Sequence, residues 1–234
     1  MKPAAMLLLG SVMLLPLVLA FLALVPAMRR HSLSLLPGLF VALFAPEGMR
    51  LAAPDVLLGA TLALDGHGRT FLGFAALLWM AAGLVARRSM RDAARTARFS
   101  AFWCLTLAGN LGVFVADDVV SFYTAFACVS LAAYPLVVHD RSAEAMRAGR
   151  VYIVLAIAGE TCLLSGFMLG ASGAESLLVA DIRSGIVDSP HRDAALLCLV
   201  GGFGIKAGLV PLHVWLPLAH PAAPTPASAV LSGA

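Results

Sequence analysis

The fold class follows from long apolar stretches of sequence, of which residues 151–170 are the clearest. They read VYIVLAIAGETCLLSGFMLG and contain a single charged residue, Glu160. Twenty residues in an α-helix rise about 30 Å, which is the thickness of the hydrocarbon core of a membrane. The whole chain of 234 residues is 61% hydrophobic and only 12% charged, whereas soluble domains carry about 25% charged residues. We therefore predict an all-α, polytopic transmembrane helical bundle.

Six further apolar stretches lie on either side of this one, which predicts about seven membrane spans. They are expected at residues 6–27, 33–45, 70–86, 99–116, 119–138, 151–170 and 194–218. The second span is the shortest, and Pro37, Glu47 and Arg50 crowd its ends. Residues 56–64 form another brief apolar run that ends in a turn-prone Asp-Gly-His-Gly sequence, which favours a re-entrant segment or a hairpin.

The connections between the spans are short, with one exception. Asp117 and Asp118 mark a very tight turn between the fourth and fifth spans. Residues 171–193 form one long polar loop, in which no catalytic set is recognisable. Four prolines fall between Pro217 and Pro226, and this cluster predicts a break in the helix.

The distribution of basic residues supports seven crossings and predicts an orientation. Seven crossings place ten arginines on one side of the membrane, against four arginines and Lys2 on the other. Without the second span the asymmetry is smaller, with eight arginines and Lys2 on one side against six arginines on the other. Because short cytoplasmic loops are enriched in Lys and Arg, we expect the Arg-rich loop at residues 87–98 inside and the amino terminus outside.

Two strongly ionisable residues lie within the predicted spans, Glu160 in the sixth and Lys206 in the seventh. A charge at the centre of a membrane helix costs about 2.5–3.5 kcal/mol on insertion scales, so such residues commonly mark an ion or substrate route. The alternative is structural: Glu160 as a protonated carboxyl hydrogen-bonded to its neighbours, and Lys206 as an ammonium held by carbonyl groups.

A regular spacing strengthens the functional interpretation of Lys206. Lys206, His213 and His220 recur every seven residues, and at 100° per residue each step of seven returns to within about 20° of the same helical direction. One helix face is therefore expected to carry three proton-exchanging groups, with water bridging the gaps. Pro211 and Pro217 lie between them and would free backbone carbonyls, which membrane proteins tolerate mainly around wet cavities. The alternative is a kinked packing helix whose histidines satisfy buried partners.

Other classes of chemistry have little support in the sequence. A net charge of +3, scattered along the chain, does not predict a nucleic-acid surface. We find no nucleotide-binding, hydrolase or zinc-protease motif, and we expect no catalytic residue, cofactor or metal site. Each of the four cysteines lies alone in a separate apolar stretch, which favours a packing role; they are Cys104, Cys128, Cys162 and Cys198.

The carboxyl-terminal segment, FGIKAGLVPLHVWLPLAHPAAPTPASAVLSGA at residues 203–234, closely resembles the signature of the proton-translocating antiporter-like family. That family comprises the large membrane subunits of respiratory complex I, of group 4 membrane-bound hydrogenases and of multi-subunit Na+/H+ antiporters. Within that family, the sequence of this segment resembles most the hydrogenase 4 and formate hydrogenlyase branch. Looser similarity extends upstream through Phe122-Tyr123 and Ser130-Leu131.

The resemblance implies a membrane subunit that passes H+ or Na+ through buried carboxylates and lysines, driven by redox chemistry elsewhere in a complex. Lys206 falls on the central lysine of the seventh helix in that family, and His213 on the histidine of its HxWLP motif. The family usually has Trp-Glu in the fifth helix, where this chain has Phe126-Ala127. We hypothesise that Glu160 supplies the missing carboxylate.

Length is the second departure from the family, whose members usually have about fourteen helices in two inverted halves. This chain is expected to hold the first half only, with residues 1–98 as amino-terminal spans and residues 99–234 as the first antiporter-like repeat up to the start of an eighth helix. The expected partners are other membrane subunits, a peripheral redox arm and a further chain that supplies the second half. The expected location is the inner (plasma) membrane. The alternative hypothesis is a non-conducting scaffold, or a truncated remnant, that docks partner subunits.

Overall fold

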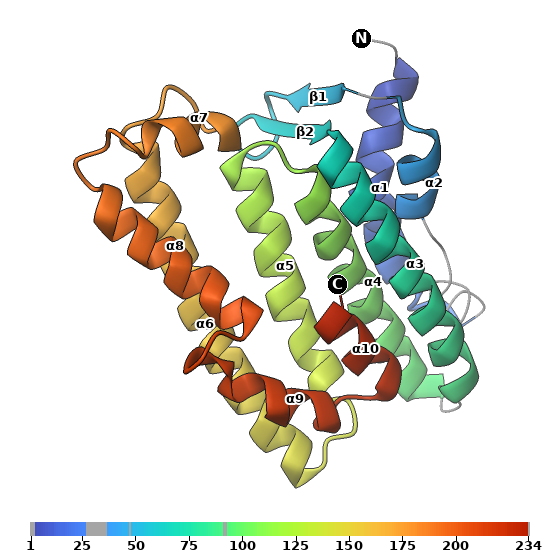
Figure 1. Ribbon diagram of the computed structural model, residues 1–234. Coiled ribbons are helices and arrows are strands. Elements are labelled where there is room, and N and C mark those ends of the chain that lie inside the picture. The colour runs from blue at the N-terminus through green and yellow to red at the C-terminus, as the bar shows by residue number, and fades with distance from the viewer. Residues whose placement is uncertain (1–2, 27–36, 47, 91–92, 234) are drawn as a thin grey trace.

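The computed structural model describes residues 3–26, 37–46, 48–90 and 93–233 and is a helical bundle with one β-hairpin (Figure 1). In chain order the elements are α1 (Pro3–Leu22), α2 (Pro37–Phe44), β1 (Met49–Ala53), β2 (Ala60–Leu64), α3 (Gly66–Ser89), α4 (Ala93–Val115), α5 (Val119–Val137), α6 (Ala143–Ala171), α7 (Val179–Gly185), α8 (Arg192–Ala207), the 3-10 helix η2 (Leu212–Trp215), α9 (Leu216–Ala222) and α10 (Thr225–Gly233).

Five helical segments in the described part of the chain are long and apolar enough to cross a membrane. They are Gly66–Ser89, Arg95–Val115, Val119–Val137, Ala143–Ala171 and Arg192–Ala222, and they match the third to seventh predicted spans. The first predicted span corresponds to α1, whose described apolar part is the shorter helix Leu7–Leu22. Of the second, the described part is the 8-residue α2, which rises only about 12 Å; residues 33–36 of that prediction lie outside the described residues.

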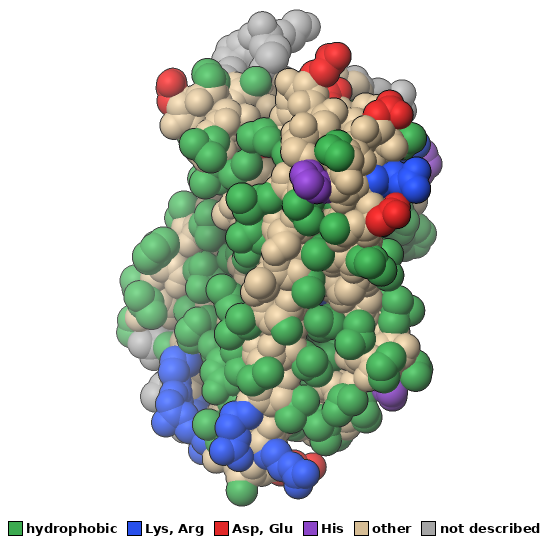
Figure 2. Space-filling view, turned by 90° about the vertical axis from the view of Figure 1, so that its left-hand side faces the viewer, with side chains coloured by type: hydrophobic (Ala, Val, Ile, Leu, Met, Phe, Trp, Pro, Cys, Tyr) green, Lys and Arg blue, Asp and Glu red, His purple; other side chains and the backbone are tan. Residues whose placement is uncertain are grey.

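The two ends of the bundle differ in charge. The hairpin, α7 and the turn between α4 and α5 lie at one end, and the connections from α3 to α4 and from α5 to α6 lie at the other (Figure 1). On the face shown in Figure 2, most acidic side chains gather at the first end and most basic ones at the second. Between them lies an apolar belt with exposed side chains such as Leu197 and Val200. The predicted grouping of arginines at one end therefore holds for the described residues; Arg29, Arg30 and Arg91 of that prediction lie outside them.

The run at residues 56–64 belongs to a β-hairpin, one of the two predicted possibilities. β2 pairs antiparallel with β1, from Met49 opposite Leu64 to Ala53 opposite Ala60. The sequence did not predict β1, so the hairpin is an addition to the predicted all-α bundle. The connecting turn includes Gly59 at φ 101°, and Leu57 and Leu58 also have positive φ, a backbone region that glycine adopts most readily.

The Asp117-Asp118 turn between α4 and α5 is tight, as predicted, and it also contacts the hairpin and the start of α7. Both oxygens of the buried Asp118 carboxylate accept hydrogen bonds, one from Ser121 N at 2.8 Å at the start of α5 and one from Thr61 N at 2.6 Å in β2. Asp117 forms an ion pair with Arg50 of β1, and its carbonyl accepts a hydrogen bond from Val179 N at 2.9 Å. The turn therefore holds the hairpin and the start of α7 against the bundle.

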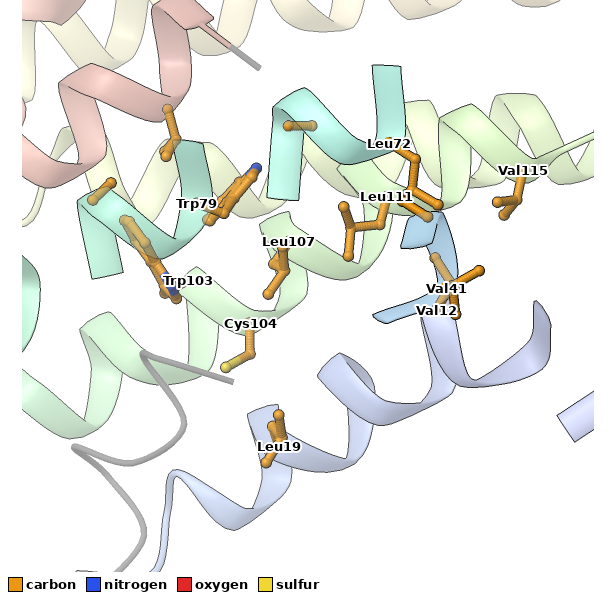
Figure 3. Close-up of a cluster of buried hydrophobic side chains, with 14 of the residues drawn as sticks. Val12, Leu19, Val41, Leu72, Trp79, Trp103, Cys104, Leu107, Leu111 and Val115 are labelled. Carbon is orange, nitrogen blue, oxygen red and sulfur yellow. The ribbon is translucent and has the colours of Figure 1, made fainter. Parts of the chain in front are cut away.

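The largest apolar core lies between α1, α2, α3 and α4, with a contribution from α10. Figure 3 shows Val12 and Leu19 of α1 facing Leu107 and Leu111 of α4. Trp79 of α3 and Trp103 of α4 pack edge to face, with ring centroids 4.6 Å apart, and the Trp79 indole donates a hydrogen bond to Asn110 Oδ1 at 2.9 Å. The indole N–H is thus satisfied inside the core, as burial of tryptophan requires.

Close helix contacts position the remaining spans. At Gly109 of α4 a Cβ atom would lie 2.6 Å from Ala125 O of α5, and at Gly202 of α8 it would lie 2.5 Å from the Leu163 side chain of α6. Small residues allow membrane helices to approach this closely. The second contact brings α8 against α6, which carries Glu160.

We predict that Asp118→Ala lowers the free energy of unfolding in detergent by about 1–3 kcal/mol, because it removes a helix cap and leaves buried N–H groups unsatisfied. Asp65→Ala is the matched control, since Asp65 also caps a helix but makes a single exposed hydrogen bond, to Gly68 N at 2.6 Å. Equal losses for the two variants, measured by denaturant titration in detergent, would contradict the role assigned to Asp118 in holding the hairpin.

Candidate functional site

The seventh span is a broken helix, and the break lies beside Lys206. α8 ends at Ala207, Gly208 follows in the left-handed conformation at φ 70°, and the chain resumes as η2 after Pro211. The expectation that Lys206, His213 and His220 share one helix face is therefore wrong, because no continuous helix joins them. The predicted break within Pro217–Pro226 is present, because α9 ends at Ala222 and α10 begins at Thr225. Gly208 and Pro211 add an earlier interruption, which the sequence did not predict.

Two of the carbonyl groups at the end of α8 accept hydrogen bonds from residues beyond the break. Gly208 N and Leu209 N donate to Ile205 O at 3.3 Å and Gly204 O at 2.9 Å. The buried Trp215 indole reaches back and donates to Ile205 O at 2.7 Å. Non-helical backbone at membrane depth is tolerated only where it is enclosed by protein or lines a wet cavity. The Trp215 indole thus caps the end of α8, the helix that carries Lys206.

The Lys206 ammonium lies against aromatic rings instead of a counter-ion. Its Nζ is 5.3 Å from the centroid of the Phe126 ring in α5 and 5.9 Å from that of Tyr152 in α6. Among the described residues, no carboxylate lies within ion-pair distance of it. An aromatic face attracts a cation by about 0.5–2 kcal/mol, which offsets only part of the cost of removing the amine from water.

The Lys206 side chain also lines a cavity of about 250 Å³ inside the bundle. Two polar residues of α4, Thr106 and Asn110, line the same cavity. The Thr106 hydroxyl donates to Phe102 O at 2.8 Å, which leaves its oxygen able to accept. The Asn110 oxygen already accepts from Trp79, which leaves its amide nitrogen able to donate. A cavity of this size with several polar groups meets the requirements for holding water.

Glu160 lies in the middle of α6 and is 7% exposed. Its Oε1 accepts a short hydrogen bond from the fully buried hydroxyl of Ser130 in α5. Its Oε2 is buried and has no hydrogen-bond partner in the described part of the chain. One oxygen is thus held in place while the other is left available to a proton or a water molecule.

Tyr152 joins the two ionisable groups into one cluster. Its hydroxyl donates to Ser130 O at 3.0 Å, next to the Glu160 carboxyl, while its ring lies beneath the Lys206 ammonium. The structure therefore brings together the two residues singled out by sequence, with Ser130 and Tyr152 between them.

The two histidines lie beyond the break, on η2 and α9. His213 is partly buried, and its Nδ1 has no partner among the described residues. His220 Nδ1 lies 3.1 Å from Ser228 Oγ of α10, and its ring stacks on Trp215 with centroids 6.3 Å apart. Pro211 directly precedes η2, and Pro217 lies in the first turn of α9. Trp215 therefore links the histidine region to the end of α8.

Sequence reasoning did not single out the neutral members of this cluster. Ser130, Tyr152, Thr106 and Asn110 are polar residues within apolar spans, but such residues are common and carry no spacing that marks a pair across helices. Tyr152 and Glu160 are eight residues apart on one helix, which was the one available signal. Trp215 is the tryptophan of the HxWLP motif, but its hydrogen bond to Ile205 O depends on the position of the helix break.

Two comparisons of sequence identify relatives of this chain. A profile described as NADH:quinone oxidoreductase/Mrp antiporter, TM, matches residues 116–234. Hydrogenase-4 component B of Escherichia coli K12 is 32% identical over 186 residues, which is 79% of this chain and 28% of that protein. NADH-quinone oxidoreductase subunit N of Desulforudis audaxviator is 32% identical over 191 residues, which is 80% of this chain and 36% of that protein. The chain thus spans about a third of the length of these relatives.

Solved structures share the fold. A chain of respiratory complex I from Thermus thermophilus superposes with a TM-score of 0.81 at 25% identity, over 96% of this chain and 49% of that one. A chain of the Mrp complex from Dietzia superposes with a TM-score of 0.79 at 20% identity, over 99% of this chain and 46% of that one. The described helices thus correspond to about half of an antiporter-like subunit. The chain is a multi-pass membrane protein and belongs to the NADH:quinone oxidoreductase/Mrp antiporter transmembrane family.

Proposed function

We propose that this chain translocates protons or Na+ across the inner (plasma) membrane as part of a redox-driven complex of the complex I or membrane-bound hydrogenase type. The observation that carries the proposal is the position of Lys206, whose amine lies inside the bundle between a polar cavity and the Glu160 cluster. The ability of this amine to take up and release a charge would explain why it lies inside the membrane.

In this mechanism Lys206 is the central proton holder and Glu160 its modulator. An ionised Glu160 favours the charged form of a nearby amine, and a protonated Glu160 no longer does so. A proton arriving at the unpartnered Oε2 of Glu160 would therefore favour release from Lys206 into the cavity lined by Thr106 and Asn110. No covalent intermediate is needed.

His213 and His220 extend the proposed route beyond the end of α8. Each has one buried ring nitrogen without a partner in the described residues, and imidazole exchanges protons near neutral pH. Pro211 and Pro217 serve this route by keeping the chain after α8 from continuing as one helix. The broken helix separates the histidines from Lys206, so water must connect them.

The wider setting of the protein is part of the same proposal. The homologous chains belong to multi-subunit assemblies, the Thermus complex I and the Mrp complex among them. We infer that this chain also works beside other membrane subunits and a peripheral redox arm. The positive-inside tendency supports an orientation with the Arg-rich end in the cytoplasm and the amino terminus outside.

One observation favours a second candidate function, a non-conducting scaffold that docks partner subunits. The fifth helix has Ala127 where the family pattern has a glutamate, so the usual partner of the lysine is missing. The two candidates differ in what Lys206 does: a scaffold needs the amine only for packing, whereas a translocating subunit needs it to gain and lose charge.

We predict that Lys206→Met abolishes ion translocation, with flux falling at least about tenfold, because the variant keeps a side chain of similar length but removes the charge. Flux would be measured in membrane vesicles driven by the electron donor of the complex, and assembly by native gel electrophoresis. Lys206→Arg should also fail to pump protons, since arginine keeps its proton. Normal pumping by a fully assembled Lys206→Met complex would leave the scaffold as the better account.

A second prediction concerns the carboxylate. Glu160→Gln keeps the hydrogen bond to Ser130 but cannot ionise, so proton flux should fall at least about tenfold with assembly preserved. Ala127→Glu in the same background should restore part of the flux, because Ala127 lies one helical turn before Ser130 on α5. Glu175→Gln, in the exposed loop before α7, is the control. Unaltered pumping by Glu160→Gln would remove this residue from the mechanism.

A third prediction tests the cavity. Thr106→Val removes a hydroxyl from its wall without changing side-chain size, so proton flux should fall severalfold. Thr161→Val is the matched control, because both hydroxyls donate to the carbonyl four residues earlier, at 2.8 and 2.9 Å, while Thr161 is exposed on the outside of α6. Equal flux in the two variants would show that protons do not pass along this wall.

A further inference from the structure

A second cavity, of about 210 Å³, lies at the Arg-rich end of the bundle, far along α4 and α5 from the Lys206 cluster. It is formed by the start of α4 and the end of α5, and its lining residues are Arg98, Phe102, Pro135, Val138, His139 and Arg141. The apolar spans of these helices end here, at Arg95 and Val137. The cavity therefore lies at the level where a membrane changes from hydrocarbon to headgroups.

The rim of this cavity is cationic. Arg98 and Arg141 are exposed there, and neither forms an ion pair with any described residue. His139 lies between them with its ring packed edge to face on Phe99, at a centroid distance of 5.2 Å. Burial lowers the pKa of His139, Asp140 opposes this effect, and Arg95, Arg98 and Arg141 lower the pKa further. These shifts favour the neutral form of His139, whose ring can donate or accept a hydrogen bond without adding charge.

The backbone at Arg141 supports a built site. Arg141 follows the end of α5 and has φ 55°, a left-handed conformation that costs a residue with a side chain about 1–2 kcal/mol. Its N–H donates to Val138 O at 3.1 Å, which closes the turn. A glycine would adopt this turn without strain, so the presence of arginine places a guanidinium beside Arg98 at a conformational cost.

Three of the lining residues are apolar, and two of them, Phe102 and Pro135, lie within the apolar spans of α4 and α5. The third is Val138, and all three, which we call the apolar floor of the cavity, are partly exposed. A cationic rim above an apolar floor matches a molecule with an anionic head and a hydrocarbon tail. An acidic segment of a neighbouring subunit would use the arginines but leave the apolar floor uncovered.

We propose that this cavity binds the phosphate headgroup of an anionic phospholipid, with Arg98 and Arg141 on the phosphate and an acyl chain along Phe102 and Val138. Guanidinium groups match phosphate oxygens with paired hydrogen bonds, and basic pockets between transmembrane helices are known to take anionic headgroups. Asp140 and Glu144 are the acidic groups of the adjoining turn. Their two negative charges are fewer than the three positive charges of Arg95, Arg98 and Arg141.

Native mass spectrometry of the protein, purified with its co-purifying subunits, would test this proposal. The probe is phosphatidylglycerol added in detergent, with phosphatidylcholine and inorganic phosphate as separate arms. We expect one phosphatidylglycerol to be retained, with affinity at least about tenfold lower in the double variant Arg98→Gln/Arg141→Gln, since the loss of even one charge-assisted hydrogen bond has about that effect. Arg88→Gln/Arg147→Gln is the matched control, because both residues are exposed at the same end and neither lines the cavity.

Three results would overturn the proposal. Equal losses in the two double variants would indicate attraction to general charge. Equal retention of phosphatidylcholine would remove the need for an anionic head, and full displacement by inorganic phosphate would show a site for free phosphate. If the double variant lowers the unfolding midpoint in detergent, the single variants Arg98→Gln and Arg141→Gln decide, and unchanged retention in both would likewise contradict a lipid site.

Discussion

A charged amine inside a bilayer must find polar neighbours, and the structure around Lys206 depends on that constraint. The amine lies against the faces of Phe126 and Tyr152 and opens onto a cavity with polar groups from α4. These contacts hold a cation without an ion pair. A strong pair would lower the cost further, but it would also fix the charge and oppose its transfer.

The break after Ala207 allows this arrangement, and it is supported by residues far apart in sequence. Gly202 lets α8 pack closely on α6, which brings Lys206 near Tyr152 and Glu160. The Trp215 indole then satisfies a carbonyl at the end of α8, so the interrupted backbone remains acceptable at membrane depth. At one end of the bundle, Asp118 ties the hairpin to the start of α5, and at the other the arginines mark the membrane boundary.

Much of the fold could be predicted because hydrocarbon thickness imposes a length on each span. The third to seventh spans, the tight Asp117-Asp118 turn and the grouping of arginines at one end follow from that rule and from charge. β1 could not be predicted, since it is held by contacts outside its own short sequence, namely the pairing with β2 and the ion pair between Arg50 and Asp117. The aligned Lys206, His213 and His220 face was wrong because a single left-handed residue, Gly208, ends the helix. Glu160 and Lys206 were identified by their cost in hydrocarbon; Ser130 and Tyr152 were not, because neutral polar residues carry no such cost.

The most direct test of the central claim is the hydration of Lys206, observed in an experimental structure of the native complex at a resolution that shows ordered water. Our account predicts water molecules in the cavity that bridge Lys206 Nζ to Thr106 and Asn110. A dry cavity, with the amine enclosed by apolar side chains and without any water path toward Glu160 or His213, would contradict it.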